Sequence, residues 1–296
     1  MTTIAFIGLG NMGGPMAGNL VRAGHDVRGF DLAASSCEAA RAEGIAVAGS
    51  ALEAVADAEV AITMLPAGRH VRAVWAQVVP ALAAGALVVD CSTIDVESAR
   101  AAHGLAEARG LLSVDAPVSG GTVGAKGAAL TFMAGGSEQA FAAAEPILAR
   151  MGRRVVHCGG AGAGQAAKIC NNMILGISMI GISEAFVLGE RLGLTHQALF
   201  DVASTSSGSC WALTTHCPVP GPVPGSAANH GYKPGFATAL MLKDLSLSQE
   251  AARAAGAQTP LGAKAAELYA AFASAGHGAD DYSAIVTYLR DRAAPG

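Results

Sequence analysis

Charged and aromatic side chains are scarce in this sequence. Only 14% of its 296 residues are charged and 5% are aromatic, and the formal net charge is −4. Binding to nucleic acid requires a basic patch or stripe, and the pair Arg153-Arg154 is too short to form one. We therefore expect no nucleic-acid partner. The hydrophobic share of 52% instead predicts a globular chain with a large core.

The sequence also lacks the closely spaced cysteines or histidines that bind metals. Its six cysteines lie far apart, and no pair of its eight histidines has metal-ligand spacing. We expect no metal, and we expect the cysteines to be buried thiols that pack as small hydrophobic residues. They are Cys37, Cys91, Cys158, Cys170, Cys210 and Cys217.

A secretory leader and a membrane-spanning run are both missing from the pattern. The chain enters a predicted strand directly after Met1, without a basic segment or a cleavage site. The longest apolar run, from Ile169 to Ser183, contains two asparagines and ends at Glu184, which is short of the roughly 18 to 20 apolar residues that span a bilayer. We expect a cytoplasmic protein without a membrane partner, and a buried helix in this run.

Glycine, in contrast, is abundant and clustered. An apolar run from Thr3 to Ile7 leads into Gly8-Leu9-Gly10-Asn11-Met12-Gly13, helical composition follows, and a second apolar run ends at Asp31. This order of strand, glycine turn, helix, strand and acid is typical of dinucleotide binding. Gly8 would permit the tight turn, Gly10 would let the backbone approach a pyrophosphate, and Gly13 would allow close packing of the helix. A glycine turn without a ligand is the alternative.

The acid after the second strand indicates which dinucleotide binds. Asp31 would accept hydrogen bonds from the adenosine ribose hydroxyls and would repel a 2′-phosphate. No arginine directly follows Asp31 to receive such a phosphate. We therefore predict NAD as the cofactor.

Strands and helices continue to alternate as far as residue 160. Further strands are predicted at 60–65, 86–90, 111–114, 130–134 and 155–157, with helices between them. This alternation predicts an α/β Rossmann domain with a doubly wound, mostly parallel sheet. Nearly everything after the glycine-rich segment at 157–164 is predicted to be helical, so we place an NAD-binding domain at 1–162. An all-helical domain at 163–296 would start with a long helix between the domains.

Ligands of such sheets bind beyond the carboxyl ends of the strands. Leu65 and Pro66 end one predicted strand, and Ser92 and Thr93 follow the next, where a nicotinamide ribose would lie; capping of a helix near Val96 is the alternative for the two hydroxyl residues. After the next strand, Ser119, Gly120 and Gly121 begin a glycine-dense segment whose backbone N–H groups could bind a small anion. A flexible hairpin loop would have the same composition.

Lys168 is the candidate for proton transfer. At about 100° per residue, Lys168 and Asn172 project from the same face of the predicted long helix, just after Gln165. Hydride transfer from an alcohol to a nicotinamide requires a group that takes the hydroxyl proton. Partial burial and a cationic nicotinamide would lower the pKa of this lysine, although a solvated surface lysine fits the pattern as well. Lys243 and Asp244, inside an apolar helix, either form a structural network or reach the cofactor.

Taken together, these motifs resemble the β-hydroxyacid dehydrogenase family over essentially the whole chain. Trp211 and the proline-rich loop that starts at Cys217 resemble the branch of this family that acts on 3-hydroxyisobutyrate. The matching segments are FIGLGNMGGPMA (Phe6–Ala17), DAPVSGG (Asp115–Gly121), GQAAKICNN (Gly164–Asn172) and YKPGFATALMLKD (Tyr232–Asp244).

The resemblance implies NAD-dependent oxidation of 3-hydroxyisobutyrate to methylmalonate semialdehyde in valine breakdown, by a homo-oligomer (a dimer or tetramer). It implies that Lys168 is catalytic and that Ser119, Gly120, Gly121 and Asn172 hold the substrate. It further implies that Leu65, Pro66, Thr93 and Lys243 contact NAD, together with the glycine turn and Asp31. His70 departs from the family, whose members often have an amide side chain beside the nicotinamide.

Two other functions fit the residues less well. The enzyme could instead reduce a related semialdehyde, such as tartronate or succinate semialdehyde. The chain could also sense NAD without turnover, although Lys168 and Asn172 on one helical face favour catalysis.

Overall fold

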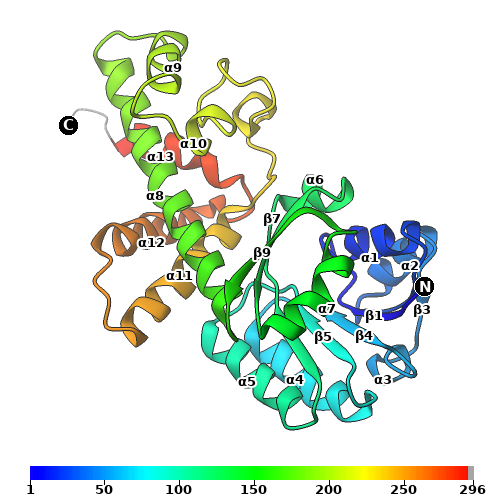
Figure 1. Ribbon diagram of the computed structural model, residues 1–296. Helices are drawn as coiled ribbons and strands as arrows, with labels where there is room; N and C mark the ends of the chain where they lie inside the picture. Colours follow the sequence, from blue (N-terminus) through cyan, green and yellow to red (C-terminus); the bar gives the residue numbers. More distant parts are fainter. Residues whose placement is uncertain (293–296) are drawn as a thin grey trace. The chain divides into compact units, whose positions relative to one another are not determined.

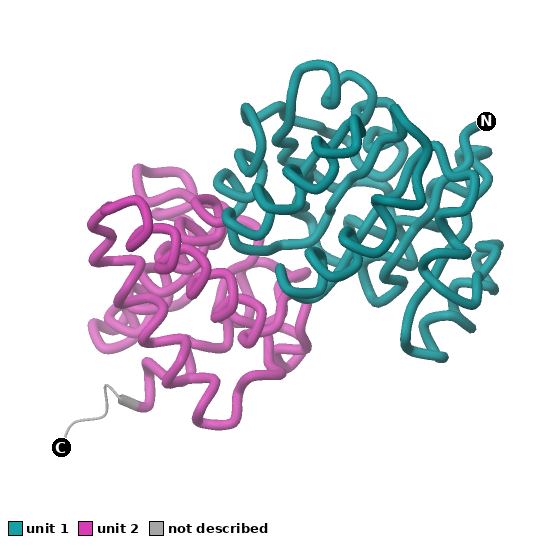
Figure 2. Tube along the Cα trace, turned by 90° about the horizontal axis from the view of Figure 1, so that it is seen from below, with its two compact units in different colours: residues 1–168 teal, residues 169–296 magenta. Residues whose placement is uncertain are grey.

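The computed structural model describes residues 1–292, and the chain forms two compact units (Figure 2). Unit 1 covers Met1–Lys168 and unit 2 begins at Ile169. The division falls inside the long helix α8 (Ala163–Arg191), whereas the sequence placed the boundary between residues 162 and 163. The first six residues of α8, Ala163 to Lys168, therefore belong to unit 1.

Unit 1 is built on a nine-stranded sheet in which β1 lies between β2 and β4 (Figure 1). The path is β3-β2-β1-β4-β5-β6-β8-β7, and β9 pairs with β8. The six strands β1 to β6 are parallel to one another, whereas β8 is antiparallel to β6 and β7. The predicted doubly wound, mostly parallel sheet is confirmed. The strands are β1 (Thr3–Ile7), β2 (Asp26–Phe30), β3 (Ala46–Val47), β4 (Val60–Thr63), β5 (Leu87–Asp90), β6 (Leu112–Asp115), β7 (Val118–Ser119), β8 (Leu130–Gly135) and β9 (Gly152–Gly159).

Helices cover both faces of this sheet, because strand side chains alternate and both sets are apolar. Phe6 of β1 packs in a cluster with α1, α2 and α7, while Ile7 packs in a second cluster with α3, α4 and α5. The helices are α1 (Gly13–Arg22), α2 (Ala34–Ala42), α3 (Ala51–Ala54), α4 (Gly68–Val78), α5 (Val96–Glu107), α6 (Gly121–Lys126) and α7 (Glu138–Leu148), with a 3₁₀ turn at Val79–Ala81.

The described part of unit 2 is helical, as predicted. Met179 of α8, Tyr269, Phe272 and Ile285 are buried in its larger core cluster. After α8 come α9 (His196–Ser204), α10 (Trp211–Thr214), α11 (Thr238–Ala254), α12 (Pro260–Phe272) and α13 (Ile285–Arg292), with 3₁₀ turns at Ala227–His230 and Tyr282–Ala284 and a π-helical turn at Ala273–His277. The proline-rich segment after Cys217 contains no helix or strand as far as Gly225, as expected.

Helix α8 is longer than its apolar run suggested. It spans 29 residues, and by length and composition it could cross a membrane, so the expectation that it is too short is wrong. The helix continues past Glu184 because that side chain is exposed and does not interrupt it. Within unit 2, α8 buries Met179 and Phe186 in the core clusters, as a core helix of a globular protein does.

The cysteines are free thiols in more varied environments than predicted. Cys91 and Cys217 are buried, and three others are partly buried. Cys170 is exposed, so the prediction of a buried thiol is wrong there. It lies two positions after Lys168, about 200° around the helix, and therefore faces away from the lysine.

Candidate active site

The glycine turn after β1 explains each of its three glycines. Gly8 has a φ of +97°, and a Cβ on it would lie 2.2 Å from the carbonyl oxygen of Met64. A Cβ on Gly13 would lie 1.8 Å from the carbonyl oxygen of Gly8, so α1 can begin this close to the turn only with glycine. A Cβ on Gly10 would meet no protein atom within 4 Å. Packing therefore requires Gly8 and Gly13, while Gly10 leaves its backbone open to a ligand such as a pyrophosphate.

Asp31 is fixed beside this turn by backbone donors. Its Oδ2 accepts a hydrogen bond from the N–H of Leu9 at 2.7 Å, and its Oδ1 accepts one from the N–H of Ala33 at 2.8 Å. The carboxylate stands at the carboxyl end of β2, and its remaining acceptor positions suit ribose hydroxyls. The residues present therefore fit the adenosine half of NAD.

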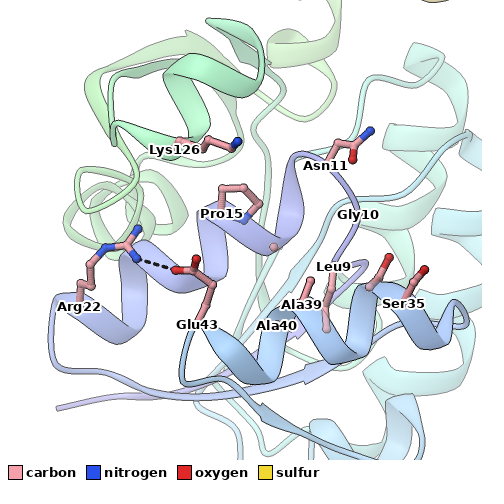
Figure 3. A pocket seen from close by; sticks show the side chains of 12 residues that line it. Leu9, Gly10, Asn11, Pro15, Arg22, Ser35, Ala39, Ala40, Glu43 and Lys126 are labelled. Atoms are coloured by element: carbon pink, nitrogen blue, oxygen red, sulfur yellow. Dashed lines mark hydrogen bonds and ion pairs between the residues drawn. The ribbon is translucent and has the colours of Figure 1, made fainter.

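A pocket of about 740 Å³ opens beside the glycine turn (Figure 3), within the usual size range of ligand sites. Gly10 and Asn11 form its upper wall, and Lys126 of α6 stands opposite α2 in the same view. Arg22 and Glu43 form an ion pair of 2.9 Å at one end. The lining residues are Leu9, Gly10, Asn11, Gly14, Pro15, Arg22, Ser35, Ser36, Ala39, Ala40, Glu43 and Lys126.

A buried polar network supports the turn that follows β4. The N–H of Leu65 donates to Ser92 Oγ at 2.7 Å, and Ser92 Oγ–H donates to Asp90 Oδ1 at 2.5 Å. Thr63 donates its hydroxyl to the same carboxylate at 2.7 Å and accepts from Trp75 Nε1 at 3.1 Å. Burial raises the pKa of Asp90 to about 6, although these hydrogen bonds oppose the rise.

This network excludes the helix-capping role that was considered for Ser92. Asp95, not Ser92, caps α5 by accepting from the N–H of Ser98 at 2.7 Å. Ser92 instead holds Leu65, so it shapes the edge where NAD contacts were predicted at Leu65, Pro66 and Thr93. His70 lies in the first turn of α4, and its Nδ1 is buried with no hydrogen-bond partner within residues 1–292.

Helix α8 starts on the carboxylate of Asp115, the last residue of β6. Asp115 Oδ1 accepts from the N–H of Gly162 at 2.8 Å, and Oδ2 accepts from the N–H of Gln165 at 2.8 Å. His103 Nε2 lies within hydrogen-bonding distance of Oδ1, at 2.9 Å. An acid thus satisfies N–H groups that a helix N-terminus leaves without partners, and it complements the helix dipole.

Two further contacts fix the same turn of α8. The Gln165 side chain is fully buried; its Nε2 donates to the carbonyl of Ser92 at 2.7 Å and its Oε1 accepts from the N–H of Ile94 at 3.1 Å. A Cβ on Gly164 would lie 2.2 Å from the carbonyl oxygen of Met133. The helix therefore begins in direct contact with the ends of β5, β6 and β8. Lys168, three residues after Gln165, is 7% exposed.

The predicted anion-binding segment folds into a strand and a short helix, not a flexible hairpin loop. Ser119 ends β7, where it pairs with Thr131 of β8, and Gly121 begins the six-residue helix α6. Gly120 and Gly121 have φ values of +132° and +60°, conformations that favour glycine. The missing Cβ atoms thus let the backbone turn from β7 directly into α6.

Three residues that the sequence singled out belong to unit 2, namely Asn172, Lys243 and Asp244. Asn172 Nδ2 donates to Asp244 Oδ2 at 2.5 Å, and Lys243 Nζ lies 3.8 Å from Asp244 Oδ1. Asp244 is buried, whereas about a third of the Lys243 side chain is exposed. The Lys243–Asp244 pair is thus part of a network with Asn172, which was one of the two alternatives for it, and the predicted contacts with NAD and substrate stay predictions.

Comparison with known proteins places this site in a family. Residues 3–160 match the NAD binding domain of 6-phosphogluconate dehydrogenase, and residues 162–289 match the family described as NAD-binding of NADP-dependent 3-hydroxyisobutyrate dehydrogenase. The chain is 47% identical to 3-hydroxyisobutyrate dehydrogenase of Pseudomonas aeruginosa, over 99% of this chain and all of that protein. The chain belongs to the 3-hydroxyisobutyrate dehydrogenase family. It is an NAD-dependent oxidoreductase that acts on a small hydroxy acid.

Other members of the 3-hydroxyisobutyrate dehydrogenase family bear on the substrate. An NAD-dependent L-serine dehydrogenase of Pseudomonas aeruginosa is 45% identical, over 96% of this chain and 97% of its own length. A solved structure of the Mycobacterium tuberculosis 3-hydroxyisobutyrate dehydrogenase with L-serine matches with a TM-score of 0.95 and 56% identity, covering 98% of this chain and 99% of that one. Both names concern β-hydroxy acids.

Sequence reasoning missed the residues that hold the site together. Asp90 and His103 were not predicted as site residues, and Asp115 appeared only as the first residue of a matching segment. An acid at the carboxyl end of a buried strand, at the ligand-binding edge of a parallel sheet, is a signal that could have marked both aspartates. Within residues 1–292, no group of three or more His, Cys, Asp or Glu side chains could hold a metal ion.

Proposed function

We propose that this enzyme oxidises 3-hydroxyisobutyrate to methylmalonate semialdehyde, the reaction expected of it in valine breakdown, with Lys168 as general base. The observation that carries the proposal is the place of Lys168: it is buried in the second turn of a helix whose start contacts the ends of three strands of the NAD-binding sheet. Ligands of such sheets bind at this edge.

Each protein group then has a defined role. When bound, NAD supplies the acceptor for the hydride. The neutral amine of Lys168 takes the hydroxyl proton of the substrate, and in the reverse direction its ammonium returns that proton to the oxygen. The N–H groups of Gly120 and Gly121 and the Ser119 hydroxyl bind the substrate carboxylate, and Asn172, one turn after Lys168, hydrogen-bonds the substrate.

The glycine turn and Asp31 would hold the adenosine and pyrophosphate of NAD. Asn11 and Met12 lie within that turn, and Leu65, Pro66 and Thr93 follow β4 and β5 on the nicotinamide side. Asp31 favours NAD over NADP because a 2′-phosphate would face its carboxylate, which backbone N–H groups already hold in place. Lys243 is proposed as a further contact of the cofactor.

Lys168→Ala tests the catalytic role. Loss of a general acid or base costs about 10²- to 10⁴-fold in turnover, so we expect kcat to fall at least about 100-fold, with the Kd for NADH changed less than about twofold. Steady-state kinetics and fluorescence titration with NADH measure the two quantities. If the purified protein binds NADH but oxidises no hydroxy acid, and Lys168→Ala changes nothing, the chain is an NAD sensor. A loss confined to NADH binding would move Lys168 to the cofactor site.

L-Serine is a second candidate substrate, because one relative is named for its oxidation and a solved relative was determined with it. L-Serine and 3-hydroxyisobutyrate share a carboxylate and a β-hydroxyl group, and they differ at the carbon between them, which carries an ammonium or a methyl group. Values of kcat/KM for 3-hydroxyisobutyrate, L-serine, glycerate and 4-hydroxybutyrate, each with NAD and NADP, rank the candidates. A higher value for any other acid, or for NADP, would overturn the assignment.

We also propose that the enzyme is a cytoplasmic homo-oligomer, a dimer or tetramer, assembled through its helical unit. Large apolar side chains are more than half exposed on these helices, and covering them would lower the free energy of assembly. They include Ile174, Leu188, Val202 and Leu261. Light scattering of the purified protein gives its mass, and a monomer at micromolar concentration would contradict the proposal.

A further inference from the structure

We infer that Asp115, held by His103, is a positioning residue that sets the place of Lys168 for proton transfer; the inference rests on the proposed role of Lys168. Asp115 lies 53 positions before Lys168 in the sequence and is itself buried, at 2% exposed. The residues that connect the two all belong to unit 1.

The carboxylate of Asp115 determines where α8 begins. Each of its oxygens accepts one backbone N–H from the start of the helix, Gly162 on Oδ1 and Gln165 on Oδ2, both at 2.8 Å. Two bonds to two different oxygens fix both the distance and the rotation of this turn relative to β6. A single cap on the helix itself, such as Ser137 at the start of α7, fixes no such relation to the sheet.

Strand β8 and His103 enclose the carboxylate of Asp115 and hold it in this position. A Cβ on Gly135 would lie 2.5 Å from Asp115 Oδ1 and 2.6 Å from the N–H nitrogen of Gly164, so strand β8 closes tightly over the contact. On the other side His103 of α5 connects Asp115 Oδ1 at 2.9 Å to Ser113 Oγ at 2.7 Å. The imidazole therefore keeps the carboxylate turned toward the helix.

The position of Lys168 follows from this fixed start of the helix. Lys168 comes three residues after Gln165, so it lies in the turn that follows the fixed first turn of α8. The backbone of Lys168 therefore cannot move unless that first turn moves as well. Displacement of a reacting group by about 1 Å can cost 10²-fold in rate. Asp115 therefore acts on the reaction through Lys168.

Asp115→Asn tests this inference in two backgrounds. The amide places an N–H₂ group against a backbone N–H, so one of the two contacts to α8 is lost. We expect kcat to fall about 10- to 100-fold in the wild-type background, with the Kd for NADH changed less than about twofold. In the Lys168→Ala background the same substitution should change the residual turnover less than about twofold, because the residue it positions is gone.

A merely structural role would give a different pattern. Equal losses of turnover in both backgrounds, or a loss of NADH affinity parallel to the loss of kcat, would overturn the inference. Ser137→Ala is the matched control: it removes the cap of α7, lowers thermal stability and leaves kcat within about twofold. If Lys168→Ala alone leaves turnover unchanged, the proposed function fails, and that outcome is separate from any result at Asp115.

His103→Leu gives a second test if Asp115→Asn does not yield folded protein. This substitution keeps both backbone bonds to Asp115 and removes the third group that orients the carboxylate. We expect a kcat loss of about 3- to 10-fold, and His103→Gln, which retains a side-chain N–H donor, should recover part of it. A His103→Leu enzyme with unchanged kcat, or one that His103→Gln does not improve upon, would overturn the role of His103.

Discussion

The buried carboxyl group of Asp90 predicts an unusual dependence of stability on pH. Burial raises its pKa from 3.8 to about 6, so between these values the folded protein binds a proton that the unfolded chain releases. Because the folded state binds more protons, the free energy of unfolding falls as pH rises through this window. The stabilising contribution is full below about pH 4 and is lost above about pH 6.

The magnitude follows from the size of the shift. A pKa rise of about 2 units corresponds to about 3 kcal/mol, of which about 2 kcal/mol lies between pH 4.5 and pH 8. Asp90→Asn cannot ionise, so this pH-dependent loss disappears in the variant. Relative to the wild type, Asp90→Asn should therefore gain about 2 kcal/mol of unfolding free energy between pH 4.5 and pH 8. Any constant cost of the amide, whose N–H₂ replaces the unpartnered Oδ2, cancels in this difference.

Urea unfolding at the two pH values measures the effect. Trp75 is buried and donates to Thr63 in the same network, so its fluorescence in a Trp211→Phe background reports on unit 1. Thermal unfolding should show the same gain as about 4 to 8 °C in Tm. Asp57→Asn, at an exposed carboxylate, is the control and should show no such gain. Equal effects of Asp90→Asn at both pH values would refute the reasoning.

Two glycine substitutions should have opposite consequences. Gly10→Ala adds a Cβ that meets no protein atom within 4 Å, so we expect the free energy of unfolding to change by less than about 1 kcal/mol. The Kd for NADH should rise at least about tenfold, because the Cβ lies where the pyrophosphate would approach. Gly104→Ala is equally uncrowded and should leave NADH binding unchanged. Gly164→Ala puts a Cβ 2.2 Å from the carbonyl oxygen of Met133 and should lower both Tm and kcat, as differential scanning fluorimetry and kinetics would show. A wild-type Kd in Gly10→Ala, or wild-type kcat in Gly164→Ala, would contradict the roles given to these positions.

The sequence predicted well those features that depend on neighbouring residues. The strand at Thr3–Ile7 and the start of α8 at Ala163 agree with the structure, because apolar periodicity and glycines act locally. Helix α4 likewise lies between two predicted strands, where a helix was expected, and its buried residues Val71, Trp75 and Val78 have helical spacing.

The contacts that organise the site were not predictable in the same way. Gln165 was expected beside Lys168, yet its side chain instead joins Ser92 and Ile94, more than 70 positions earlier. Helical periodicity gives the face on which a residue lies and contains no information about which strand end that face meets. Such contacts follow only once the strand order and register are known.

Register also explains why two similar acids behave differently. Asp90 of β5 and Asp115 of β6 are directly paired in the sheet, and the nearby charge of Asp115 adds to the rise in the pKa of Asp90. Asp115 has two backbone N–H donors and an imidazole, whereas one oxygen of Asp90 has no partner within residues 1–292. Asp115 therefore joins β6 to the start of α8, whereas Asp90 joins Thr63 of β4 to Ser92 after β5. Two acids at paired positions of the sheet thus differ because different elements end beside them.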